Sequence, residues 1–219
     1  MKEYIVKQGE DGDKHLSKLV NTPHYGADEA GRGCLNGPVV VASCKIEADK
    51  IPELNDSKQL SEKQRDALFD KTVALAEDYK VVVMSPQDVD RLNVLQASLT
   101  GMRNAYLESE KLAGLYLVDG NRLPAPIDGC DIYAVIKGDF RVPAISAASI
   151  LAKVSRDRIM MDLHQERPYM GYDKHKGYGT QLHLEMMRKH GLDDSYRMTV
   201  GPVKEINAPE QIKEQGSLF

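Results

Sequence analysis

Two adjacent carboxylates stand beside a glycine-rich segment near the N-terminus. Asp28 and Glu29 are followed by Gly31-Arg32-Gly33. Side-by-side carboxylates repel each other unless a cation neutralises them or one of them takes up a proton. Glycines around an arginine let the backbone approach a ligand while a cation reaches it. Two interpretations stay open: a solvated turn, where such residues are common, or a ligand site at which the strand ends or bends so that both carboxylates face it.

Three further aspartates lie at positions that fit either a catalytic role or a purely structural one. Asp119 directly follows the apolar strand predicted over 115–118, and Asp139 follows the next predicted strand. Open α/β sheets often build sites at the carboxyl ends of their strands, although an aspartate that starts a turn also explains each position. Asp157 lies inside a predicted helix, where pairing with a neighbouring basic residue is the stronger alternative.

Together these residues form a set of hard oxygen donors. The set comprises Asp28, Glu29 and Asp119, with either Asp139 or Asp157. Without cysteine or histidine, it suits Mg²⁺ or Mn²⁺ rather than zinc. Two such ions, roughly 3.5–4 Å apart, bind both the attacking and the leaving oxygen of a phosphodiester. This chemistry requires the fold to bring the acids together.

A basic and aromatic segment precedes the helix predicted over 180–190. Residues 172–180 combine lysines, tyrosines and glycines, and residues 137–189 hold ten Lys+Arg against six Asp+Glu in a chain whose net charge is −4. Such local positive charge, with an aromatic ring to stack on a base or sugar, is typical of a nucleic-acid site. The alternative is a surface loop whose tyrosines pack on the core.

The elements that must position these residues alternate between strands and helices. A capping box at 61–64 predicts a helix to about 77, and Pro86 opens a further helical region that includes a long helix over 92–112, weakened at Gly101. Other strands are predicted over 37–46, 79–84 and 131–136, and another helix over 144–167. The pattern predicts an α/β fold with helices packed on a central sheet. Residues 1–22 are polar and are expected to form a loose N-terminal arm.

Length and composition limit the class of protein. A chain of 219 residues suits one domain of ordinary size. No stretch reaches the ~20 apolar residues of a membrane helix, and the charged N-terminus lacks the apolar core of a signal peptide. Three cysteines without metal-type spacing favour a reduced, cytoplasmic protein.

Seven ordered sequence blocks carry a family resemblance. The blocks are Asp28–Gly33 with Asn36–Val40, then Asn55–Leu60, Val118–Gly120, Lys137–Asp139, Ser146–Val154, Arg156-Asp157 and His175–Thr180. With these blocks in this order, the chain resembles the type 2 ribonuclease H family, that of bacterial ribonuclease HII, over roughly residues 24–203. The resemblance implies a ribonuclease H-like fold, a central mixed β-sheet flanked by helices, with a small C-terminal helical part. It places a catalytic domain over 23–206 and a tail over 207–219.

The same resemblance implies an activity and residue roles. It implies Mg²⁺- or Mn²⁺-dependent cleavage of the RNA strand of RNA/DNA hybrids. It also implies incision 5′ of single ribonucleotides embedded in duplex DNA, which leaves 3′-hydroxyl and 5′-phosphate ends. The implied catalytic acids are Asp28, Glu29, Asp119 and Asp139, the first three as metal ligands, with Asp157 a possible additional acid. The implied substrate contacts are Gly31, Arg32, Gly33 and Tyr178, followed by Lys58, Ser149, Lys153 and Lys176.

The last five residues resemble a docking peptide. Gln215 followed by Leu218-Phe219 is similar to the motif with which bacterial repair proteins bind the DNA sliding clamp, although a frayed polar terminus is the simpler interpretation. We expect a monomer whose partners are nucleic acids. Two rival functions remain: a DNA-cleaving nuclease or integrase of the same fold, and a non-catalytic hybrid-binding or clamp-associated protein.

Overall fold

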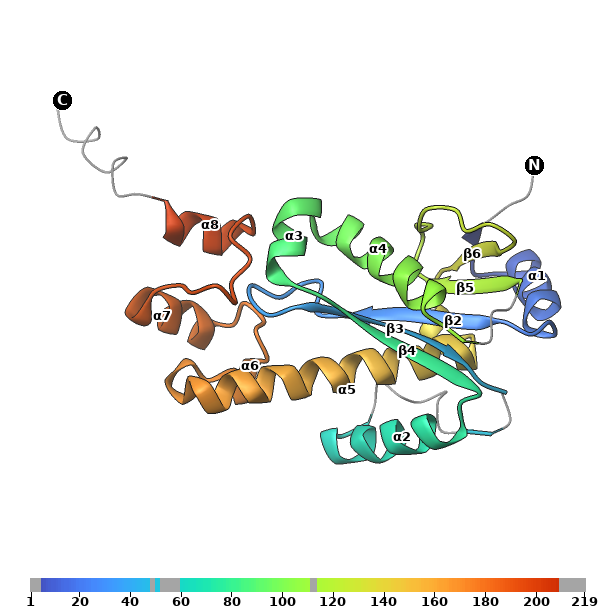
Figure 1. Ribbon diagram of the computed structural model, residues 1–219, viewed down its shortest axis with the longest axis horizontal. Helices are drawn as coiled ribbons and strands as arrows, with labels where there is room; N and C mark the ends of the chain where they lie inside the picture. Colours follow the sequence, from blue (N-terminus) through green and yellow to red (C-terminus); the bar gives the residue numbers. More distant parts are fainter. Residues whose placement is uncertain (1–4, 48–49, 52–59, 111–113, 209–219) are drawn as a thin grey trace, which may run out of the picture.

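The computed structural model describes residues 5–47, 50–51, 60–110 and 114–208. Its centre is a six-stranded mixed sheet with the strand order β1-β6-β5-β2-β3-β4 (Figure 1). The pairs β1–β6, β6–β5 and β5–β2 are parallel, whereas β2–β3 and β3–β4 are antiparallel. The strand bounds are Ile5–Val6 (β1), Tyr25–Ala30 (β2), Val39–Lys45 (β3), Asp78–Met84 (β4), Leu115–Asp119 (β5) and Asp131–Val135 (β6).

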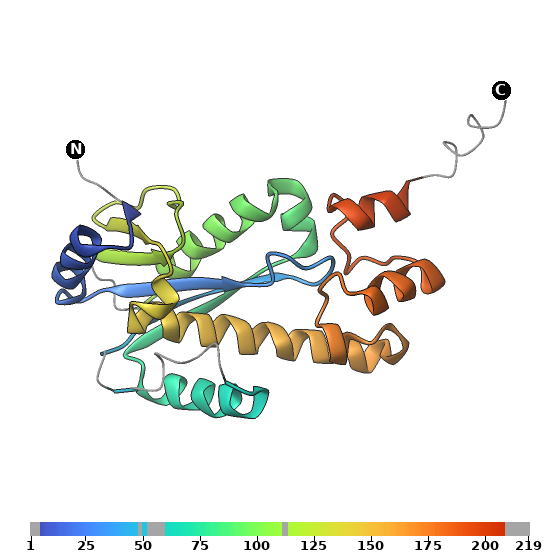
Figure 2. The same cartoon turned by 180° about the vertical axis from the view of Figure 1, so that it is seen from behind.

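Helices cover both faces of this sheet. On one face lies α5 (Pro143–Glu166), with α2 (Glu62–Leu75) packed outside it, and on the other lie α3 (Pro86–Leu92) and α4 (Val94–Leu107) (Figures 1 and 2). At one end of the sheet, α6 (Tyr172–His175), α7 (Gln181–His190) and α8 (Gly201–Asn207) form a small helical part with its own apolar core. The predicted mixed sheet with flanking helices is therefore confirmed.

The long central helix α5 is the scaffold of the site. Pro143 opens it, and small buried side chains such as Ala147 and Ala148 let its backbone approach β2 closely. A Cβ atom at Gly26 would lie 2.2 Å from the Ala144 carbonyl carbon, so glycine is needed in this strand. Because α5 packs closely on β2, the residues of α5 that follow Ala144 have a fixed position relative to the carboxyl end of β2.

Two expectations about the elements were wrong. The N-terminal segment is not a loose arm: β1 pairs with β6, and α1 (Glu10–Val20) buries Leu16 while its charged face stays exposed. The helical region after Pro86 breaks at Asn93, whose φ of 67° separates α3 from α4. Gly101 lies inside α4, where a Cβ atom would come within 2.7 Å of Val41, so it permits close helix-to-sheet packing.

None of the helices in the described part of the chain combines the length and the apolar run that a membrane crossing requires.

Candidate active site

Asp28 and Glu29 lie at the carboxyl end of the central strand β2. The strand ends one residue later, at Ala30, which meets the condition for both carboxylates to serve one site. Asp28 is buried and its carboxylate accepts a hydrogen bond of 2.7 Å from the Glu29 backbone N–H. The Glu29 side chain is only 10% exposed and forms an ion pair of 3.0 Å with Arg32. The pair therefore opens directly onto the glycine-rich connection to β3.

Asp119 and Asp139 complete an acidic cluster at this edge of the sheet. Asp119 is the last residue of β5, which runs parallel to β2, so its carboxylate emerges at the same edge. Its Oδ1 accepts hydrogen bonds from the backbone N–H groups of Gly138 (2.7 Å) and Asp139 (3.3 Å). These bonds tie the buried Asp139, in the 3₁₀ turn Gly138–Phe140, to the end of β5.

Burial and mutual repulsion raise the pKa values of the first two carboxyl groups. The pKa of Asp28 lies well above its ordinary value because of burial, reinforced by the charges of Glu29 and Asp119 and opposed by a hydrogen bond from Ser149. Burial also raises the pKa of Glu29; Arg32 opposes this, while Asp119 and Asp139 add to it. Carboxylates crowded in this way favour a cation.

The donor chemistry fits a hard divalent ion. All the candidate ligands are carboxylate oxygens, the type that Mg²⁺ and Mn²⁺ prefer. Across the described residues, no three histidine, cysteine, aspartate or glutamate side chains already surround a common metal position. Glu29 is turned toward Arg32 and Asp119 toward backbone N–H donors, which offset part of their charge. A divalent cation in the cluster would neutralise the carboxylate charge more completely than Arg32 and the backbone N–H groups do.

A pocket of about 400 Å³ adjoins the acidic cluster. Its lining includes Glu29 and nearly all of the predicted substrate contacts whose side chains the structure describes, namely Gly31, Arg32, Gly33, Ser149, Lys153 and Tyr178. The Tyr178 ring is 42% exposed and lies 5.9 Å from the Lys153 ammonium. Segments more than a hundred residues apart therefore form one cavity with cationic and aromatic walls.

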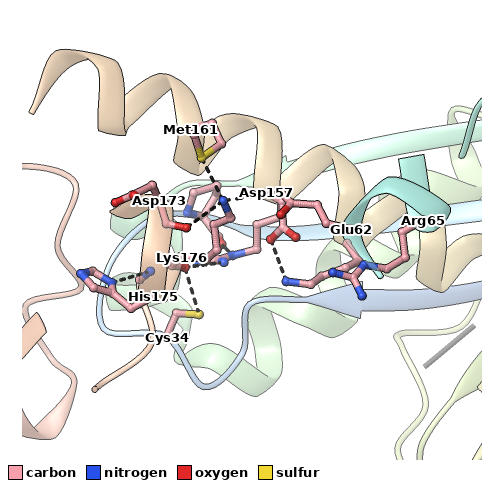
Figure 3. Close-up of polar contacts among 12 residues, drawn as sticks. Cys34, Glu62, Arg65, Asp157, Met161, Asp173, His175 and Lys176 are labelled. Atoms are coloured by element: carbon pink, nitrogen blue, oxygen red, sulfur yellow. Dashed lines mark hydrogen bonds and ion pairs between the residues drawn. The ribbon is translucent and has the colours of Figure 1, made fainter. Parts of the chain in front are cut away.

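Arg65 of α2 also lines this pocket, a position that the sequence analysis did not predict. It follows the capping box that begins the helix, and its Nη1 donates a hydrogen bond of 2.6 Å to the Leu60 carbonyl. Figure 3 shows its side chain extending from α2 beside the polar groups of α5. Only the packing of α2 against α5 reveals this placement.

Asp157 and Lys176 lie beside the pocket rather than in its wall. Asp157 accepts a hydrogen bond of 2.7 Å from the Lys153 ammonium, in agreement with the pairing role considered for it. The Lys176 ammonium contacts Met161 Sδ at 2.9 Å and the Asp173 carbonyl at 3.2 Å (Figure 3). Lys58 lies outside the described residues.

A mixed sheet that carries carboxylates at the ends of two adjacent parallel strands, beside a pocket lined by cationic side chains, fits the class of metal-dependent nucleases. A protein-family model described as Ribonuclease HII matches residues 25–201. Ribonuclease HII from Xylella fastidiosa strain M12 is 45% identical over 206 residues, which cover 93% of this chain and 88% of that protein. Ribonuclease HII from Nitrosomonas europaea is 48% identical over 180 residues, which cover 81% and 82%.

Solved structures agree with these relatives. Ribonuclease H2 from Pyrococcus horikoshii OT3 superposes with a TM-score of 0.69 at 28% identity, over 84% of this chain and 96% of that one. RNase HII from Archaeoglobus fulgidus, solved as a complex with PCNA, gives a TM-score of 0.64 at 25% identity, over 82% and 95%. Bst-RNase HIII in complex with Mn²⁺ shares the fold at 15% identity, with a TM-score of 0.69 over 91% and 81%.

The chain belongs to the ribonuclease HII family. It is accordingly a metal-dependent endoribonuclease that acts on RNA/DNA hybrids. The family and the cleavage of RNA/DNA hybrids implied by the sequence blocks are both confirmed.

Proposed function

We propose that the enzyme incises duplex DNA on the 5′ side of a single embedded ribonucleotide and leaves 3′-hydroxyl and 5′-phosphate ends. One observation supports this proposal most strongly: Glu29 belongs both to the acidic cluster and to the wall of the cationic pocket, so the two lie side by side. A strand bound in the pocket would therefore pass directly beside the carboxylates.

In this proposal Asp28, Glu29, Asp119 and Asp139 hold Mg²⁺ or Mn²⁺. When bound, the cation would lower the pKa of water and stabilise the leaving oxygen. The two backbone N–H donors on Asp119 fix its orientation before any ligand arrives. Asp157 would keep the Lys153 ammonium in place rather than bind metal, because it already forms a short ion pair with that group.

The Gly31–Gly33 loop would recognise the ribonucleotide through its backbone. The φ of Gly31 is 92°, a conformation that side-chain-bearing residues rarely adopt. Peptide groups near the sugar could pair with a 2′-hydroxyl, which both donates and accepts hydrogen bonds. A site with such groups leaves them unpaired on pure DNA, and this can discriminate by about 10⁴-fold. The exposed Tyr178 ring would stack on the sugar at the DNA side of the junction.

Cationic side chains around the pocket would bind the flanking phosphates. Lys153 lines the pocket, and its pairing with Asp157 holds it in position. Arg65 joins Arg32 in the wall and adds a guanidinium from α2. Ser149 lines the pocket and would exchange its hydrogen bond to Asp28 for one to a phosphate oxygen, while Lys176 would need to leave Met161 and Asp173 to reach one. Lys58 keeps its proposed phosphate role on the sequence alone.

The activity test compares two duplexes that differ by one 2′-hydroxyl. The wild-type protein is incubated with each duplex in Mg²⁺, in Mn²⁺ and in EDTA, and the cut is mapped with its end groups. The proposal expects one cut, 5′ of the ribonucleotide, that requires metal and is absent from the all-DNA duplex. Cleavage of both duplexes at similar rates would favour a DNA nuclease, and tight binding without cleavage would favour a non-catalytic hybrid-binding protein.

We also propose that the C-terminal tail docks on the DNA sliding clamp and that the enzyme works as a monomer in the cytoplasm. Residues Gln215–Phe219 lie outside the described residues, so the support comes from the sequence motif and from the PCNA complex of the Archaeoglobus relative. Deletion of the last five residues should abolish clamp binding in a pull-down and leave hybrid cleavage unchanged. Undiminished clamp binding by the truncated chain would refute the docking role.

A further inference from the structure

Two fully buried arginines lie beneath the substrate pocket. Arg156 comes from α5, and Arg197 comes from the segment between α7 and α8; each has 0% of its surface exposed. Among the described residues, neither forms an ion pair with a carboxylate. Burial, reinforced by the charge of Arg156, lowers the pKa of Arg197 to about 10, so the Arg197 guanidinium remains charged at neutral pH.

Both guanidinium groups bind backbone carbonyls of the connection between β2 and β3. Arg156 donates to the carbonyls of Pro38 (3.0 Å) and Asn36 (3.1 Å), and its Nη1 reaches across to Lys176 (2.8 Å). Arg197 donates to the carbonyls of Gly37 (2.9 Å), Arg32 (3.1 Å) and Cys34 (3.0 Å). Five of these six carbonyls belong to the loop that contains Arg32 and Gly33, and the sixth precedes Tyr178 by two residues.

The backbone itself joins the same segments. The Leu35 N–H donates to the Gly177 carbonyl at 2.9 Å, and Cys34 and Tyr178 form an isolated β-bridge. The Arg197 N–H donates to the Leu35 carbonyl at 3.1 Å, so the loop lies between the Tyr178 segment and the Arg197 segment. In Figure 1 the β2–β3 connection reaches the C-terminal helical part at this end of the sheet.

The backbone of the loop and of the Tyr178 segment packs so closely on neighbouring side chains that two positions accept only glycine. A Cβ atom at Gly31 would lie 2.0 Å from Arg156 Nε, and one at Gly177 would lie 2.5 Å from Asn36 Oδ1. The Arg156 guanidinium also lies 5.9 Å from the centre of the Tyr178 ring. Arg156 therefore touches the two parts of the pocket that are proposed to contact the ribonucleotide and the following deoxyribose.

Burying the two guanidinium groups without carboxylate partners among the described residues carries a desolvation cost. We therefore look for their role in the position that they give to the loop. Burying a cation without a carboxylate partner is unfavourable, and the buried Nη2 of Arg197 has no hydrogen-bond partner in the described structure. An apolar side chain would avoid that cost but leave the loop carbonyls without donors. A rigid planar fork binds several carbonyls in a fixed relation, which a lysine cannot do.

We propose that Arg156 and Arg197 are positioning residues that set the enzyme's preference for a ribonucleotide–deoxyribonucleotide junction, by locking the Gly31–Gly33 loop at a fixed spacing from Tyr178. The inference rests on the proposed roles of that loop and of Tyr178. A single embedded ribonucleotide needs both contacts at the right separation. A uniform hybrid has no junction at the cut and tolerates a looser spacing.

The first test measures kcat and KM on a single-ribonucleotide duplex and on a uniform hybrid for R197K and R156K. Each variant keeps a positive charge and loses the planar fork. We expect kcat/KM on the junction duplex to fall at least about tenfold more than on the hybrid, since sub-ångström misplacement is costly in positioned reactions. R141K is the matched control, because Arg141 also donates to backbone carbonyls (Val6, Lys7 and Ile136) but lies away from the pocket.

The second test uses two buried cysteines to separate local loosening from unfolding. Cys34 lies in the loop, and Cys44 lies in β3 with its side chain in the apolar core; both are 0% exposed. In R197K and R156K we expect a thiol reagent to label Cys34 faster than in R141K while Cys44 stays protected, as read by mass spectrometry. Equal labelling of both cysteines would show that the arginines hold the whole fold, which would overturn the proposal.

A further variant separates this proposal from the proposed function. Y178A alone should lower the junction-to-hybrid ratio, and R197K in the Y178A background should lower it little more, because both changes remove the same spacing. If Y178A lowers the ratio and the arginine variants do not, the positioning role is wrong and the junction role of Tyr178 stands. If the arginine variants lower it and Y178A does not, the spacing from Tyr178 does not set the preference, so the proposal and the junction role of Tyr178 are both wrong.

Discussion

Replacing Asp119 by asparagine should abolish cleavage and at the same time stabilise the metal-free protein. Asp119 is one of the charges that raise the pKa of both Asp28 and Glu29. Because burial and repulsion raise these pKa values in the folded state, ionisation opposes folding: stability is greatest below the ordinary pKa and is lost as the pH rises through the raised one. Removing one charge of the cluster relieves this opposition at neutral pH.

The size of the effect follows from the charges and hydrogen bonds involved. At an effective dielectric constant of about 20, two unit charges roughly 6–8 Å apart repel by about 2–3 kcal/mol. The asparagine oxygen can still accept from Gly138 and Asp139, and the weaker acceptor loses about 1–2 kcal/mol over the two bonds. With two relieved repulsions, the net gain is about 2–5 kcal/mol, or roughly 4–20 °C in Tm for a chain of this length.

The assay is thermal unfolding of the wild type and D119N in EDTA, at pH 7.5 and at pH 4. D162N, a change at an exposed aspartate of α5, is the matched control and should melt like the wild type. The advantage of D119N should shrink at pH 4, where the wild-type carboxylates take up protons, and added Mn²⁺ should stabilise the wild type more than D119N. A D119N protein that is correctly folded but melts below the wild type at pH 7.5 would refute the repulsion argument.

Two further predictions concern the loop and the helical part. Gly31→Ala should lower the Tm and reduce cleavage on every substrate, because its Cβ would collide with Arg156 and its φ is 92°. Gly33→Ala is the control: its Cβ would meet nothing within 4 Å, so it should melt like the wild type. Equal melting temperatures for the two variants would contradict this prediction. Burial lowers the pKa of His183 to about 4, so stability should fall as the pH drops below 6.5 toward 4, with a slope of at most about 1.4 kcal/mol per pH unit from this group. His183→Asn, measured by denaturant unfolding at pH 7, 6 and 5, should flatten that slope, and an unchanged slope would assign it to other groups.

Much of the site was predictable because its acids follow strong local signals. Asp119 ends a short apolar strand, and Asp28 precedes a glycine-rich connection, so both positions at a sheet edge could be predicted. The capping box at Ser61 and the helix opened by Pro86 likewise appear in the structure as the sequence predicts. These signals depend on residues within four positions of one another.

Features that depend on distant pairing were not predictable. The N-terminal segment is ordered because β1 pairs with β6 and because Arg141 donates hydrogen bonds to the carbonyls of Val6 and Lys7. Arg141 is more than 130 residues from both of them in the sequence. The pocket position of Arg65 arises only when α2 packs on α5. The carbonyl contacts of Arg197 were invisible for the same reason, since nothing in the local sequence marks a buried arginine.

The location of bound metal tests the central claim most directly. Crystals of the wild-type protein soaked in Mn²⁺ should give an anomalous diffraction peak beside the carboxylates of Asp28 and Asp119 at the ends of β2 and β5. The competing location is the pocket between α2 and α5, whose wall includes Glu62, Asp66, Asp157 and Asp162. A peak there, with none beside Asp28 and Asp119, would contradict the assignment of the acidic cluster as the catalytic centre.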